Sequence, residues 1–234
     1  MPRAPQAPAP RVEVLRGPLV DLAADLGIAV CLSEVQGSSI VVVESIGAGS
    51  GSPPLSPGLR LPFVAPFGRE FVAWAPVAAR RDWLAAAGPV NRKFRTRISL
   101  VLDIIRRRGY GVERLSDELN RVVTALLALD GGRGSDAISA RLAGALADLT
   151  VVDVLGEEAT SGPAVAVATV SAPIRDSSGA VALTVSAQPY RELATDAIDR
   201  LGAQVQAFAG RASDLLGSGP GEREPRRTSL RAHA

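Results

Sequence analysis

Hydrophobic positions along the chain predict long amphipathic helices. Residues 12–26 carry an apolar stripe at helical spacing, and Pro18 lies inside it, so we expect either a kink or two shorter helices. Residues 92–108 predict a second helix with one apolar face and a basic remainder. A third long helix is expected at residues 190–216.

Alternating apolar and polar positions predict two β-hairpins. Residues 28–35 and 39–46 flank one turn, and residues 164–175 and 180–188 flank another, Asp176-Ser177-Ser178-Gly179, in which Asp comes first and Gly last as in a type I turn. Antiparallel strand pairs separated by helices predict an α+β fold, with helices packed against one sheet.

The remaining segments complete the expected domain organisation. An extended piece at 59–63 and a helix at 69–74 precede the basic helix. Residues 116–129 and 135–149 predict a helical hairpin joined by glycines. We expect a disordered, proline-rich lead-in at 1–11, one domain at 12–216 and a disordered basic tail at 217–234.

Composition excludes several classes of function. The net charge of +2 is too small to imply a nucleic-acid or membrane partner, and there is no apolar run long enough to span a membrane. Cys31 is the one cysteine, which fits a reducing interior, so we expect a cytoplasmic protein. The one histidine, His233, lies in the tail, so we expect no histidine base, no metal site, no cofactor and no enzyme activity.

The second hairpin carries the most informative pattern. With a four-residue turn, Ser171 lies opposite Thr184, Thr169 opposite Ser186, and Val167 opposite Gln188, all on one face. The other face is wholly apolar and packs. The mixed face suits a small pocket with a few hydrogen-bonding groups, and it equally suits a solvent-facing side of the sheet.

Four segments together resemble a known family. They are residues 18–33 with the hairpin that follows, the run Arg60-Leu61-Pro62-Phe63 to Phe67-Gly68-Arg69, the helix end Ile104–Tyr110, and residues 170–189. In this order they resemble the effector domain of IclR-type transcription regulators. The resemblance implies a GAF-like domain, a curved antiparallel sheet flanked by helices, with a small-molecule pocket over the sheet.

The resemblance also implies which residues contact the effector. The polar face of the second hairpin becomes one wall of a pocket, and the Leu-Pro loop closes it with two phenylalanines. The implied effector-binding residues are Leu61, Phe63, Pro66, Phe67, Gly68, Val167, Thr169, Ser186 and Gln188.

Three features depart from the family pattern. The winged helix-turn-helix that precedes the family's domain is replaced by the proline-rich stub, and residues 113–163 form a helical insertion where the family has a short connector. The family's acidic pocket residue in that connector has no assigned counterpart. Pro66 stands where the family offers a backbone N–H to a carboxylate, which argues against the family's usual keto or aromatic acids.

The sequence therefore predicts a ligand-sensing effector domain that binds a small organic molecule, forms a homodimer and does not bind DNA specifically by itself. Full-length regulators are possible further partners. A structural dimerisation module with a vestigial pocket, or an enzyme on a GAF-like scaffold, are the alternatives.

Overall fold

The computed structural model describes residues 10–47, 55, 57–115 and 164–217. The first helix, α1 (Pro10–Leu26), leads into the hairpin of β1 (Ala29–Gln36) and β2 (Ser39–Ile46), followed by β3 (Arg60–Pro62). Helix α1 continues through Pro18, so the expected division into two shorter helices is wrong.

Three helices and a short strand follow: α2 (Arg69–Val72), α3 (Val77–Ala85), α4 (Arg92–Arg108) and β4 (Gly111–Arg114). Helix α4 has the predicted bounds because both ends are capped. The side chain of Asn91 accepts a hydrogen bond from the N–H of Phe94 at 2.8 Å, and Gly109 adopts the left-handed conformation that ends a helix. Helix α3 and strand β4 were not predicted.

The second half of the domain contains β5 (Val165–Arg175), β6 (Val181–Gln188), β7 (Arg191–Leu193) and α8 (Thr195–Gly217). Strand β7 occupies residues that the sequence placed in the last helix. Of the expected insertion, Glu113 and Arg114 lie in β4. The predicted helical hairpin, most of the lead-in and the tail after Gly217 lie outside the described residues.

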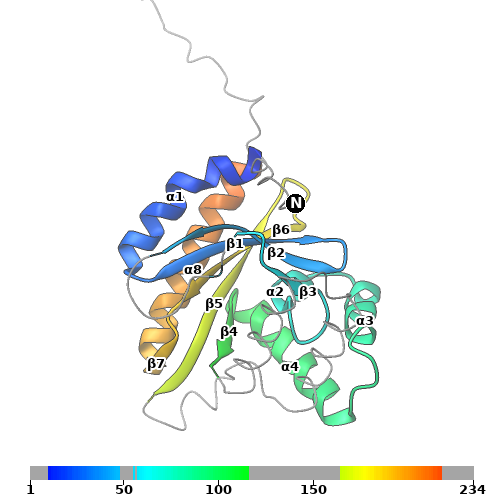
Figure 1. The fold of residues 1–234 in the computed structure, drawn as a ribbon. Coiled ribbons are helices and arrows are strands. Elements are labelled where there is room, and N and C mark those ends of the chain that lie inside the picture. The colour runs from blue at the N-terminus through cyan, green and yellow to red at the C-terminus, as the bar shows by residue number, and fades with distance from the viewer. Residues whose placement is uncertain (1–9, 48–54, 56, 116–163, 218–234) are drawn as a thin grey trace, which may run out of the picture.

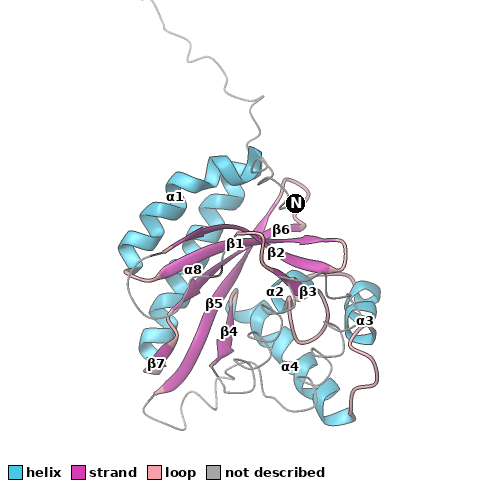
Figure 2. Cartoon of the chain, viewed as in Figure 1, coloured by secondary structure: helices cyan, strands magenta, loops and turns pink. Residues whose placement is uncertain are grey.

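The strands of the described residues form one antiparallel sheet in the order β3-β2-β1-β6-β5-β4, and β7 pairs with the first residues of β5. Helices α1 and α8 cover one face of this curled sheet, which we call the outer face (Figure 1). Helices α2, α3 and α4 lie on the other, inner face (Figure 2). The predicted α+β architecture, a curved antiparallel sheet flanked by helices, is confirmed. Among the helices in the described ranges, none is sufficiently long and apolar to cross a bilayer.

The outer face forms the larger core. Side chains from β1, β5 and β6 alternate toward it and pack against the apolar stripes of α1 and α8. Its fully buried members include Leu15, Leu19, Val30, Leu32, Val170, Ile174, Leu183, Val205 and Phe208. This core holds helices α1 and α8 against the sheet, so the polar side chains of the sheet lie on the inner face.

The predicted register of the second hairpin is wrong by two residues. Ser171 pairs with Ser186, and Ile174 with Leu183. One shift arises at the turn, where Gly179 is left-handed and the N–H of Asp176 donates to the carbonyl of Ala180 at 2.9 Å. The second arises from an irregularity between Ile174 and Arg175. Because two single shifts restore the alternation, Thr169 and Ser186 still share the inner face.

Val167 does not share that face. Glu113 pairs with Thr169, but Arg114 pairs with Val167, so Ala168 is an extra residue on β5. The alternation changes at this bulge, and Val167 is fully buried in the outer core. Its predicted place beside Thr169 is therefore wrong. The bulge between Ile174 and Arg175 likewise places Val181 against the inner apolar cluster instead of the outer one.

Candidate ligand site on the inner face of the sheet

A row of polar side chains crosses three neighbouring strands on the inner face. Cys31 pairs with Ser186 across β1 and β6, and Ser186 pairs with Ser171 across β6 and β5. Directly paired residues in an antiparallel sheet point to the same side. The alternation along each strand adds further members, and the polar row of the described residues is Cys31, Ser33, Thr169, Ser171, Thr184, Ser186 and Gln188.

The hydroxyl groups of the row are hydrogen-bonded to one another and to β4. The hydroxyl of Ser171 donates to that of Ser186 at 2.8 Å, and the hydroxyl of Thr169 donates to Oε2 of Glu113 at 3.2 Å. Thr169 and Ser171 are buried, whereas Ser186 is partly exposed. Ser186 is therefore the most accessible hydroxyl of the row.

Gln188 has a buried side-chain amide. The residue is 5% exposed, and within the described residues neither Oε1 nor Nε2 has a hydrogen-bond partner. Its amide lies beside the thiol of Cys31. A buried polar group without a partner costs about 1–3 kcal/mol, so such an amide is suited to a molecule that enters the site and pairs with it.

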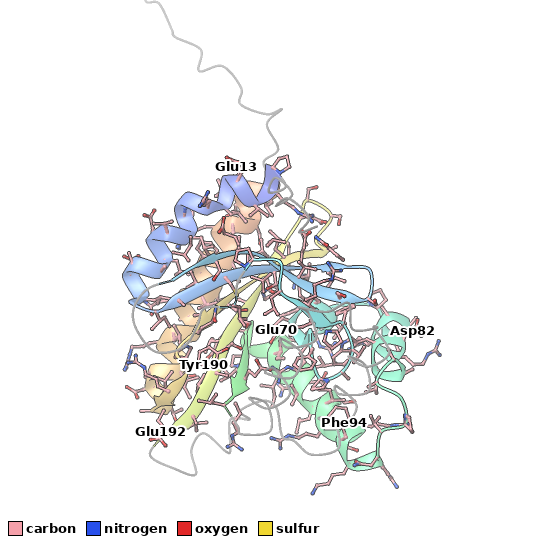
Figure 3. All side chains as sticks on the ribbon, in the orientation of Figure 1. Glu13, Glu70, Asp82, Phe94, Tyr190 and Glu192 are labelled. Carbon is pink, nitrogen blue, oxygen red and sulfur yellow. The ribbon has the colours of Figure 1, made fainter. Side chains whose placement is uncertain are left out.

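Two acidic residues and one arginine adjoin the row. Nη2 of Arg69 lies 3.6 Å from Oε1 of Glu113. The carboxylate of Glu70 lies against Gly111, where a Cβ atom would come within 2.0 Å of Oε1, and Gly111 pairs with Ser171. Figure 3 shows Glu70 in the interior of the molecule, in contrast to Asp82 and Glu13 at its periphery.

Tyr190 follows the end of β6 and has an unusual backbone. Its φ of 45° lies in the left-handed region, which bulky residues rarely adopt and which is enriched at functional sites. Burial raises the pKa of its phenol, and the charge of Glu113 and the neighbouring Cys31 raise the pKa further. Burial also raises the pKa of the Cys31 thiol to about 12. Both groups are therefore neutral near pH 7.

The loop between β3 and α2 provides the apolar side of the site. The rings of Phe63 and Phe71 meet edge to face, with centroids 6.1 Å apart. Gly68 is left-handed, and a Cβ atom there would come within 2.8 Å of the Phe63 ring, so the loop requires glycine at this position. The carbonyl of Phe67 accepts a hydrogen bond from Nε1 of Trp83 at 2.8 Å. These contacts hold the loop in one conformation.

The structure brings most of the predicted site residues to one side of the sheet. Thr169, Ser186 and Gln188 lie in the polar row. An apolar cluster on the same side of the sheet includes Ala168 and Tyr190. The predicted loop residues belong to this cluster or lie next to it, and they are Leu61, Phe63, Pro66, Phe67 and Gly68. Val167 alone among the predicted residues lies on the opposite side.

Sequence reasoning missed the charged part of the site. Gly111 and Glu113 alternate directly after α4, which is the pattern of a strand, but the sequence places Gly111 in the turn that closes the helix and Glu113 in the insertion. Tyr190 was assigned to the last helix. The alternation along β1 puts Cys31 and Ser33 on one side of the strand, and only the pairing of β1 with β6 connects that side to Ser186.

A hollow lies elsewhere on the molecule, away from the polar row. A solvent-open depression of about 580 Å³ lies where the end of α1 meets β7 and α8, and its lining includes Asp25, Arg191, Arg200 and Gln204. Arg191, Arg200 and Gln204 are exposed, and it contains none of the predicted site residues. Among the described residues, no group of histidine, cysteine and acidic side chains could hold a metal ion.

Comparison with known proteins supports the fold. No family model matches the chain, and no curated protein sequence matches it. Among solved structures, a domain of an IclR-family transcriptional regulator is similar, with a TM-score of 0.56 and 18% identity over 89% of this chain and 97% of that one. The C-terminal domain of the E. coli regulator KdgR gives a TM-score of 0.53 and 16% identity, covering 88% of this chain and 98% of that one.

A longer regulator is also similar. The IclR transcriptional regulator from Alicyclobacillus acidocaldarius gives a TM-score of 0.54 and 15% identity over 89% of this chain and 68% of that one. The two isolated domains are thus covered almost completely, and the longer chain in part. This chain therefore has the fold of the C-terminal effector domain of IclR-family transcription regulators.

Proposed function

We propose that this chain is the small-molecule-sensing domain of an IclR-type transcription regulator. Its fold is that of domains from such regulators, and its inner sheet face carries a polar row beside an apolar loop. A few placed hydrogen-bonding groups within an otherwise apolar site are typical of pockets for small organic molecules. Sensing is then the binding of a molecule between the sheet and the loop.

The observation that carries the proposal is the buried amide of Gln188, which has no hydrogen-bond partner within the described ranges. A purely structural module would gain stability by replacing this residue with an apolar one, because a buried amide without partners is unfavourable. Retaining it fits a site in which a ligand completes the hydrogen bonds.

A thermal-shift screen of small organic molecules tests the proposal. A ligand at about one hundred times its Kd adds roughly 2.7 kcal/mol to the free energy of unfolding. For each hit, the Kd is then measured on the wild type and on Gln188→Met, which keeps the length of the side chain and removes the amide. A hit that binds the inner face loses affinity in this variant.

The matched control is Gln204→Met, the same change at an exposed position in the depression beside α8. If Gln204→Met weakens the hits and Gln188→Met does not, the ligand binds beside α8 and the proposed site is wrong. If no hit responds to Gln188→Met, the alternative of a structural module with a vestigial pocket is favoured.

Assembly and DNA binding belong to the same proposal. We expect the chain to form a homodimer, and light scattering that reports a monomer at tens of micromolar would contradict this. We expect no sequence-specific DNA binding by the chain alone, since specific reading requires an element shaped for the major groove. A sequence-selective footprint at physiological salt would overturn that expectation.

A further inference from the structure

The groups around the polar row have an uneven balance of charge. The contacts of the described residues place two carboxylates, Glu70 and Glu113, and one guanidinium, Arg69, against it. The positive charge is already shared with Glu113 at 3.6 Å. Arg175 also belongs to the inner side, but it stacks on Trp74 at 4.7 Å, at the end of β5 and β6 that is farthest from Gln188.

The neutral groups of the site do not change this balance. The thiol of Cys31 and the phenol of Tyr190 stay protonated near pH 7, because burial raises the pKa of both. Two backbone N–H groups of the loop are already used, and a third position has none. The N–H of Phe63 donates to Ser38, that of Phe67 donates to Val64, and Pro66 has no N–H.

The side-chain amide of Gln188 determines which hydrogen-bonding groups a ligand needs in order to pair with it. A glutamine amide presents one donor group and one acceptor side by side, and both are without partners in the described structure. A carboxylate can satisfy the N–H₂ group but not the carbonyl oxygen. A group that itself carries a donor next to an acceptor satisfies both.

We propose that the inner-face site binds an uncharged or cationic small molecule with an amide-like edge, such as a primary amide, a lactam or a pyrimidine, and disfavours carboxylates. This inference rests on the proposed function, because it assumes that the inner face is the ligand site. Gln188 pairs with the amide-like edge. Glu70 and Glu113 repel a ligand carboxylate, and such repulsion is strong where water is largely excluded.

Matched probe pairs test the inference on the full chain. Uracil and orotate differ by one carboxylate, and benzamide and nicotinamide are compared with benzoate and nicotinate. We expect each neutral probe to bind at least tenfold more tightly than its acid when the Kd is measured by calorimetry or ligand-observed NMR. Gln188→Met should weaken the neutral probes at least fivefold, and Gln204→Met should leave them unchanged.

Two further variants test the source of the discrimination. Glu70→Gln and Glu113→Gln each remove one negative charge while keeping the shape of the side chain. Each should therefore reduce the ratio of the Kd of the acid to the Kd of its neutral counterpart severalfold. Circular dichroism and the unfolding midpoint establish that each variant is folded. If one of them does not fold, the other provides the test.

The outcomes separate the inference from the proposed function. If the acids bind as tightly as the neutral probes and depend on Gln188, the inference is wrong while the inner face remains the ligand site. The amide-like edge is also wrong if two results are found together. The first is that no amide, lactam or pyrimidine binds at a concentration of about 10 millimolar. The second is that the binding of other screened molecules depends on Gln188. If no ligand of any kind depends on Gln188, the proposed function itself fails.

Discussion

The two faces of the sheet differ in the kind of side chain that they bury and in how far the buried polar groups are hydrogen-bonded. On the outer face, apolar side chains such as Val30, Ile174 and Leu183 are fully buried against α1 and α8. On the inner face, strands from the same sheet present hydroxyls, a thiol and an amide, and the amide of Gln188 lacks partners in the described structure. The outer face thus stabilises the fold, and the inner face keeps polar groups at a cost in stability.

This difference indicates where function resides. Burial of apolar surface contributes in proportion to area and requires no particular partner. Buried polar groups require partners at defined positions, so a face that retains them without pairing all of them is specialised for something other than stability. Substitutions on the two faces should therefore have effects of opposite sign.

The largest effect is expected from the outer face. Phe208→Ala removes a side chain that is 1% exposed and lies between α8 and the sheet, so it should lower the free energy of unfolding by about 3–5 kcal/mol. Urea unfolding followed by circular dichroism measures the change. A loss below about 1 kcal/mol would show that α8 is not part of the main core.

The inner face should show the opposite sign. Gln188→Met removes the unpaired amide, so it should raise the free energy of unfolding by about 1–3 kcal/mol in the absence of ligand. The same urea experiment applies, with Gln204→Met as the exposed control. A marked destabilisation would mean that the amide is satisfied in the free protein, and the contrast between the faces would be lost.

The pH dependence of stability reports on the buried thiol. The pKa of Cys31 rises from 9.0 to about 12 on folding, so above pH 9 the unfolded chain releases a proton that the folded chain keeps. Stability then falls with rising pH, by up to about 1.4 kcal/mol per pH unit. The slope is about half of this at pH 9 and fades within about one pH unit below it.

Urea unfolding at pH 8, 9 and 10 measures this slope in the wild type and in Cys31→Ala. The comparison of the two proteins isolates Cys31, because the phenol of Tyr190, whose pKa folding also raises, contributes to both. The variant should lose part of the decline between pH 9 and 10. Equal slopes in the two proteins would place the thiol in contact with water.

The smallest effect concerns the hydroxyl of Ser186. Ser186→Ala should weaken ligand binding by about 0.5–1.5 kcal/mol, because it removes one hydrogen-bonding group from the row. The protein should still fold, but the buried hydroxyl of Ser171 loses its acceptor, so a small loss of stability is also expected. Calorimetry measures the Kd, and Ser99→Ala on the exposed side of α4 is the control. An unchanged Kd would remove Ser186 from the site.

The sequence predicted the layers of the fold more accurately than the details of the sheet. Helix α4 and strand β2 have the predicted bounds, because Asn91, Gly109 and the Gly37 turn mark their ends locally. The register between β5 and β6 depends on bulges, which have no sequence signal as clear as a cap. Only an even total shift kept Thr169 and Ser186 on the same face.

The charged half of the site was beyond the reach of local patterns. Glu70 and Glu113 are far apart in the sequence, and they meet the polar row only through the packing of α2 and the pairing of β4 with β5. Val167 was misplaced for a related reason, since the bulge at Ala168 reverses the alternation of one strand without changing its composition. Contacts between segments far apart in the sequence thus determine both the position of the two carboxylates and the face on which Val167 lies.

The central claim is that the inner face binds the ligand through Gln188, and one NMR measurement tests it most directly. The side-chain N–H₂ signals of Gln188 are assigned by their absence from the spectrum of Gln188→Met. When a hit from the thermal-shift screen saturates the protein, these signals should shift, and those of Gln204 should not. Unchanged Gln188 signals at saturation would contradict the account.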